Sequence, residues 1–153
     1  MDKFLGNKYL FLFSRLFIGI LFLFSGITKM MEPVAEFALQ IEQYALLPQV
    51  LVTPFAIVLP WVELVFGGLL LLGIWVKLDS IILGLTMLSF IIAISQAMIR
   101  GIGLTDCGCF GEVIEVGETP GKVLLRDIAF MLPIVYLFFS KTKFFSLDRY
   151  LLK

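Results

Sequence analysis

The sequence predicts an all-α membrane protein: four transmembrane helices in a bundle, with a short amphipathic interfacial helix between the first two and an extracytoplasmic cysteine loop between the last two. Hydrophobic residues make up 60% of the 153 residues, well above the roughly 45–50% of soluble domains. Mean hydropathy is +1.03. The length leaves room for about four spans of roughly 20 residues with short connections. Residues 1–153 are therefore predicted to form a single transmembrane domain.

Four apolar runs define the predicted spans, at about 9–29, 51–75, 80–99 and 123–139. The first run contains Arg15 and is too long to be a removable signal peptide, so we expect an uncleaved signal-anchor. Pro54 and Pro60 should kink or delay the second helix. Lys77 and Asp79 are expected to form the tight turn before the third.

A short amphipathic helix is predicted between the first two spans. Apolar residues recur there at helical spacing, at Val34, Phe37, Ala38, Ile41 and Ala45. Acidic residues interrupt them, at Glu32, Glu36 and Glu42. This pattern is typical of a helix that lies on the membrane surface.

The longest polar interval carries the two cysteines of the chain, Cys107 and Cys109, one glycine apart. Two close thiols can form a strained, readily reduced disulfide, and thiolates also bind soft metals. The motif alone leaves redox, metal-binding and structural roles open. Histidine is absent, and two cysteines cannot complete a tetrahedral zinc site alone, so no resident metal is predicted. The 12 basic and 12 acidic residues balance and do not favour a nucleic-acid partner.

Lysine and arginine counts in the short loops predict the orientation. One side holds seven: Lys3, Lys8, Lys77, Lys141, Lys143, Arg149 and Lys153. The other side holds four: Lys29, Arg100, Lys122 and Arg126. This bias places both termini in the cytoplasm and the cysteine loop outside. In the inner membrane of a bacterium the loop would face the oxidising periplasm, where a disulfide persists.

Among the charged residues inside the predicted spans, Arg15 and Glu63 lie away from the span ends, and Glu63 lies near the middle of its span. A lone carboxylate there is costly, so it should face the bundle interior with a partner. Arg15 is the expected partner. Two interpretations stay open: a structural ion pair, or a cavity for a polar-headed lipid such as a quinone, with Trp61 and Gln96 in its wall. At the outer end of the fourth span, Arg126 near the cysteines would favour a thiolate.

Three motifs together resemble a known family. They are Gly26-Ile27-Thr28-Lys29 after an early arginine, Leu59-Pro60-Trp61-Val62-Glu63-Leu64 leading to Gly67 and Gly68, and Asp106-Cys107-Gly108-Cys109-Phe110-Gly111 followed by Leu125-Arg126. The chain resembles the MauE branch of the DoxX-like membrane proteins over nearly its whole length. The resemblance implies a four-helix membrane protein. The branch is required for making methylamine dehydrogenase, whose small subunit needs many periplasmic disulfides. Related members occur beside thioredoxin-like proteins.

Two classes of function follow from these features. In the first, Cys107 and Cys109 exchange electrons with a periplasmic thioredoxin-like or disulfide-containing partner, with Arg126 assisting and quinone as a candidate cofactor. In the second, the chain is a non-catalytic assembly or scaffold protein whose cysteine loop docks a partner or holds Cu(I), with Met98 as the nearest thioether ligand. The lipid bilayer is a partner in both cases.

Overall fold

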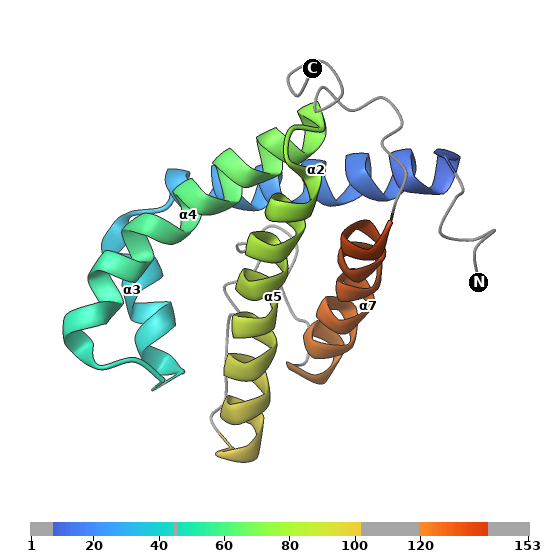
Figure 1. Cartoon of the computed structure of the whole chain (residues 1–153). Helices are drawn as coiled ribbons and strands as arrows, with labels where there is room; N and C mark the ends of the chain where they lie inside the picture. The colour runs from blue at the N-terminus through green and yellow to red at the C-terminus, as the bar shows by residue number, and fades with distance from the viewer. Residues whose placement is uncertain (1–7, 45, 102–119, 141–153) are drawn as a thin grey trace.

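The computed structural model describes residues 8–44, 46–101 and 120–140 (Figure 1). The regular structure within these ranges is entirely helical. The helices are α2 (Lys8–Met31), α3 (Val34–Gln43), α4 (Gln49–Leu72), α5 (Val76–Ile99) and α7 (Pro120–Phe139). The predicted all-α class and the short helix between the first two long ones are confirmed for the described residues.

Four of these helices pack in a ring. α2 contacts α4 and α7, α5 contacts the same two helices, and α3 packs against α4. Three helices, α2, α4 and α5, are long and apolar enough to cross a membrane, so the chain is a multi-pass membrane protein. The fourth helix, α7, carries Lys122, Arg126 and Asp127 in its first half, and its membrane crossing stays a prediction.

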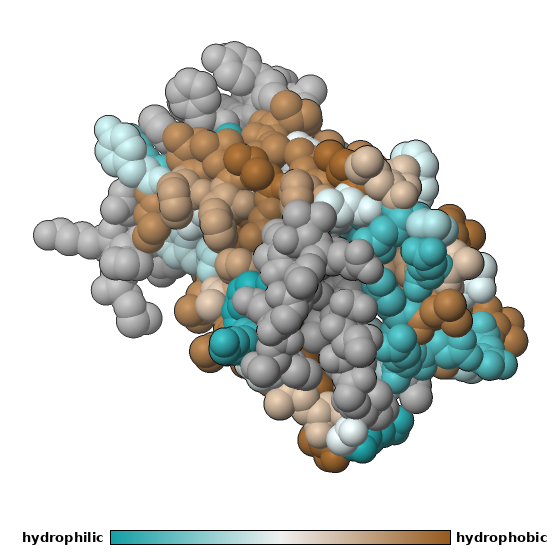
Figure 2. Space-filling view, turned by 180° about the vertical axis from the view of Figure 1, so that it is seen from behind, coloured by the Kyte–Doolittle hydropathy of each residue, from teal (hydrophilic) through white to brown (hydrophobic). Residues whose placement is uncertain are grey.

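The molecular surface has a hydrophobic part and a hydrophilic part. Hydrophobic residues cover the long helices, and a hydrophilic patch gathers on the side where α3 lies (Figure 2). The apolar face of α3 is buried at Phe37 and Ile41, while Val34 is about half exposed. Ala45, predicted on the same face, lies outside the described residues. The predicted helix is therefore present and packs on α4.

Glycines set how closely α2 and α4 approach. A Cβ on Gly26 would lie 3.0 Å from the backbone nitrogen of Leu64 and 3.0 Å from the carbonyl oxygen of Pro60. A Cβ on Gly19 would lie 2.6 Å from Cγ of Leu71. The two helices meet at backbone distance, as small residues permit in membrane proteins. This packing puts the last turns of α2 beside the middle of α4.

The turn between α4 and α5 is at Gly73, not at Lys77 and Asp79 as predicted. Gly73 is left-handed (φ 72°), and the N–H of Ile74 donates to the carbonyl of Leu69 at 3.0 Å. This is a Schellman helix end, which favours glycine. Lys77 and Asp79 consequently lie in the first turn of α5, where the helix dipole favours an acidic residue.

The two prolines of α4 do not delay the helix. α4 begins at Gln49, upstream of both Pro54 and Pro60, and continues to Leu72. Pro60 places its carbonyl oxygen against Gly26, so the residue that lacks an N–H donor lies at the closest contact between α2 and α4. Of the two expected effects of these prolines, a kink or a delayed start, the delayed start is not found.

Candidate functional site

A buried ion pair joins α2 to α4. Nζ of Lys29 lies 2.6 Å from Oε1 of Glu63, and the side chains are 0% and 1% exposed. Glu63 is near the middle of α4, and Lys29 is in the last turn of α2. The stagger of the two helices, set at Gly26, brings these residues together. The pair therefore lies deep in the bundle, although Lys29 is close to a helix end.

The second carboxylate oxygen of Glu63 and the ammonium group of Lys29 make further contacts. The hydroxyl of Ser25 donates to Oε2 of Glu63 at 2.9 Å. Nζ of Lys29 lies 4.7 Å from the ring centroid of Phe90 and 5.7 Å from that of Phe37, within the range of a cation–π contact. Residues from α2, α3, α4 and α5 thus meet at one ammonium group. Such a closed, satisfied cluster stabilises the relative positions of these helices.

The predicted partnership of Arg15 with Glu63 is wrong, because Lys29 and Ser25 occupy both carboxylate oxygens. Arg15 is buried, but it lies ten residues before Ser25 on the same helix, roughly 15 Å along the axis. It is one turn from Gly19, which packs against Leu71 near the end of α4. Arg15 and Glu63 therefore lie at different levels of the bundle.

The other predicted cavity residues are not gathered around Glu63. Trp61 is 54% exposed on the outside of α4. It is two positions from the buried Glu63, which places the two side chains about 200° apart on the helix. Gln96 lies near the end of α5, and its Oε1 is buried with no hydrogen-bond partner in the part of the chain that the structure describes.

Cys107 and Cys109 lie outside the described residues, but both ends of their segment can be located. The segment follows Gly101, after α5, and α7 begins at Pro120. A Cβ on Gly121 would lie 3.8 Å from Cε of Met98. The end of α5 and the start of α7 are therefore neighbours, and the cysteine segment leaves and re-enters the bundle at one end.

Arg126, the third predicted site residue, lies in the second turn of α7. Its side chain is 18% exposed, and its Nε is 3.6 Å from Oδ1 of Asp127, which is fully buried. Arg126 thus lies at the end of the bundle where the cysteine segment is attached.

Sequence reasoning missed two buried charges. Lys29, at the end of the first predicted span and counted with the outer basic residues, is buried in α2, where it shares a helix face with Ser25 at i, i+4 spacing, which is the signal that places both against Glu63. Asp79 is fully buried in the first turn of α5, and neither carboxylate oxygen has a hydrogen-bond partner among the described residues. The sequence predicts Asp79 in the tight turn before the third span, because charged residues between two apolar runs are typical of a turn.

Comparisons with known proteins agree with this architecture. The chain matches the family described as "Methylamine utilisation protein MauE" over residues 7–140. It is 33% identical to methylamine utilization protein MauE of Methylorubrum extorquens over 130 residues, which cover 80% of this chain and 69% of that protein. The Methylophilus methylotrophus protein of the same name is 31% identical over 129 residues, covering 84% and 67%.

A third relative is longer than this chain. Protein TlpB of Flavobacterium psychrophilum is 30% identical over 152 residues, which cover 94% of this chain but 40% of that protein. No solved structure matches. The wider DoxX-like grouping stays a prediction. The family match begins one residue before α2 and ends one residue after α7. The chain therefore belongs to the MauE family.

Proposed function

We propose that this membrane protein is a thiol–disulfide redox protein in which Cys107 and Cys109 exchange electrons with a periplasmic partner. The observation that carries the proposal is the pair of cysteines, the only two in the chain, in a segment whose two ends meet at one end of the α5–α7 hairpin. A segment anchored in this way can present both sulfurs to a partner outside the membrane. Membership of the MauE family supports a role in the maturation of another protein.

The proposed step is an ordinary disulfide exchange. A thiolate of the reduced partner attacks one sulfur of the Cys107–Cys109 disulfide, the S–S bond breaks, and the other sulfur leaves as a thiolate that takes up a proton. A second partner thiolate then attacks the mixed disulfide. The partner gains a disulfide, and the cysteine pair is left as two thiols. Arg126 would favour the departing thiolate.

Reoxidation of the pair requires an acceptor for two electrons and two protons, and a quinone in the bilayer has this capacity. Glu63 does not fit a quinone head group, because Lys29 and Ser25 already occupy its oxygens. Gln96 fits better: its Oε1 is buried with no hydrogen-bond partner among the described residues and can accept from a quinol hydroxyl, while its N–H groups can donate to a quinone carbonyl. We therefore place the proposed quinone contact at Gln96.

The proposal includes a location and an orientation. The protein would lie in the inner membrane of a bacterium with both termini inside and the cysteine segment in the periplasm, beside a thioredoxin-like protein or a disulfide-rich substrate. A membrane-impermeant maleimide should label the reduced cysteines in intact spheroplasts. Labelling that appears only after the membrane is broken would reverse the orientation.

Trapping of a mixed disulfide tests the exchange itself. Cys107→Ser and Cys109→Ser should each abolish partner oxidation, and one of them should accumulate a covalent adduct with the partner. The doubly substituted protein is the control and should form none. If both single variants support the partner's oxidation as well as the wild type does, the chain acts instead as a scaffold. Retention of Cu(I) by the wild type but not by the double variant would favour the copper-holding alternative.

A further inference from the structure

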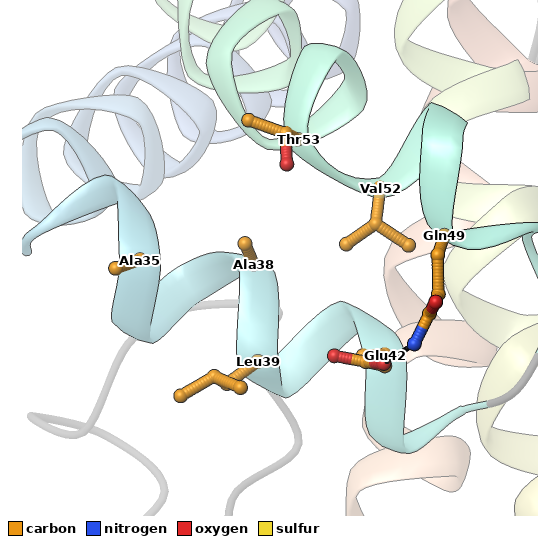
Figure 3. A pocket seen from close by; sticks show the side chains of 7 residues that line it. All are labelled: Ala35, Ala38, Leu39, Glu42, Gln49, Val52 and Thr53. Carbon is orange, nitrogen blue, oxygen red and sulfur yellow. Dashed lines mark hydrogen bonds between the residues drawn. The ribbon is translucent and has the colours of Figure 1, made fainter.

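A hollow of about 140 Å³ lies between α3 and the first two turns of α4. Its apolar wall is made by Ala35, Ala38, Leu39 and Val52, and its polar wall by Glu42, Gln49 and Thr53. Figure 3 shows the Val52 side chain and the Thr53 oxygen directed into the space between the two helices, with Glu42 and Gln49 closing one side. The volume exceeds that of a single water molecule several times over.

The polar wall carries three groups with acceptor oxygens. Nε2 of Gln49 donates to Oε1 of Glu42 at 2.7 Å, which orients the amide and leaves its oxygen available. The second carboxylate oxygen of Glu42 accepts no hydrogen bond from the described part of the chain. No hydrogen bond joins the Thr53 hydroxyl to another residue in the described ranges. A carboxylate, an amide oxygen and a hydroxyl therefore border the same small space.

The charge of this region is negative. Residues 30–76 contain no lysine or arginine, while α3 carries Glu36 and Glu42. The nearest basic residue before this stretch, Lys29, is buried and paired with Glu63. Glu42 is thus the charged group of the hollow, and no basic side chain of this stretch offsets it. A ligand with a positive charge complements it.

We propose that this hollow binds a primary ammonium group carried on a short alkyl chain. Three acceptor groups match the three N–H donors of such a group, and the alanine, leucine and valine side chains suit a short alkyl chain. The hollow lies at the end of α4 that begins a predicted span, so the ammonium has two candidate sources: an ethanolamine lipid head group or a free alkylamine. The proposal is independent of the cysteine chemistry.

A ligand-observed NMR titration of the full-length protein in detergent tests the site, with methylammonium as the probe. Tetramethylammonium has the same charge but no N–H donor, and it should bind at least tenfold more weakly. Glu42→Gln should weaken methylammonium binding by about tenfold or more, because a charge-assisted hydrogen bond is lost. Thr53→Val should weaken it less.

The matched control is Glu36→Gln, which removes the same charge from the same helix at a residue that does not line the hollow. It should leave binding within about twofold. Equal effects of the Glu36 and Glu42 substitutions, or equal binding of the two probes, would overturn the proposal. Thermal stability of each variant, expected to match the wild type, excludes loss of the fold as the cause.

Native mass spectrometry separates the two sources. Wild-type protein released from vesicles of mixed ethanolamine and choline phospholipids should retain the ethanolamine lipid selectively if the lipid is the source, and Glu42→Gln should lose this selectivity. Binding of methylammonium without lipid selectivity would identify a free amine instead. If folded protein neither binds methylammonium nor retains the ethanolamine lipid selectively, the proposed site is contradicted.

Discussion

Lys29 and Glu63 form a closed ion pair, 2.6 Å from Nζ to Oε1, in the interior of a membrane-embedded bundle. Both side chains are shielded from solvent, and Ser25 and two phenylalanine rings complete their surroundings. Removing one partner of such a pair leaves the other buried without compensation. A single substitution in this pair should therefore lower the free energy of unfolding more than replacement of both residues by apolar ones.

Glu63→Gln should destabilise the protein by roughly 3–5 kcal/mol, because the Lys29 ammonium is left buried without its counter-charge. The double variant Lys29→Met with Glu63→Leu should recover most of this loss, since apolar replacement of a whole buried pair is often neutral or favourable. Thermal unfolding in detergent measures both. Unchanged stability of Glu63→Gln would show that the pair contributes little.

Asp79→Asn should have the opposite effect. The Asp79 carboxylate is fully buried with no hydrogen-bond partner among the described residues, so replacing it with a neutral amide strands no cation and lowers the cost of burial. We expect the free energy of unfolding to rise by about 1–3 kcal/mol. Glu63→Gln is measured beside it, because it makes the same chemical change at a carboxylate that has a partner. A loss as large as that of Glu63→Gln would mean that Asp79 has a partner in the folded protein.

Gly26→Ala should cost about 1–3 kcal/mol, because the added methyl group meets backbone atoms of α4 at 3.0 Å and the two helices must separate. Gly68→Ala is the matched control: its added methyl group would meet only Leu23 Cδ2, at 3.9 Å. It should be neutral or slightly stabilising, as expected for alanine in a helix. Similar losses in the two variants would argue against close contact between α2 and α4 at Gly26.

Arg126→Ala should slow exchange of the proposed Cys107–Cys109 disulfide with a model thiol, because a nearby cation favours the leaving thiolate. Thermal unfolding is measured beside it, because the buried Asp127 loses its neighbouring cation. Arg126→Lys should retain part of the rate. Lys122→Ala removes an exposed charge at the same end of α7 and controls for general electrostatics. Stopped-flow measurement of the exchange rate distinguishes a specific effect of Arg126 from a general effect of positive charge. Equal slowing by Arg126→Ala and Lys122→Ala would contradict the role proposed for Arg126.

The sequence predicted the helices well because long apolar runs dominate it. It did not predict the partner of Glu63, because pairing depends on the stagger between α2 and α4, which is fixed by backbone contacts at Gly19 and Gly26. Hydropathy carries no information about that stagger. The sequence therefore favours Arg15, which lies further inside its span, although Lys29 is the partner in the structure.

Two assignments at helix ends failed for a related reason. Gly73 after the last leucine of α4 is a helix-end signal, but the charges of Lys77 and Asp79 also favour a turn and lie four to six residues further on. Lys29 was counted as a loop charge, although it is buried in the last turn of α2. Removing it from the four basic residues assigned to the outer side leaves three, against seven on the other. The predicted orientation is thereby favoured more strongly, and it stays a prediction.

Redox titration of the purified full-length protein tests the central claim most directly. The protein is equilibrated with mixtures of reduced and oxidised dithiothreitol, alkylated, and analysed by mass spectrometry, with and without added quinone. We expect Cys107 and Cys109 to pass together from two free thiols to one internal disulfide, and quinone to oxidise the reduced pair. Two thiols that remain free under oxidising conditions throughout the titration would contradict the thiol–disulfide function.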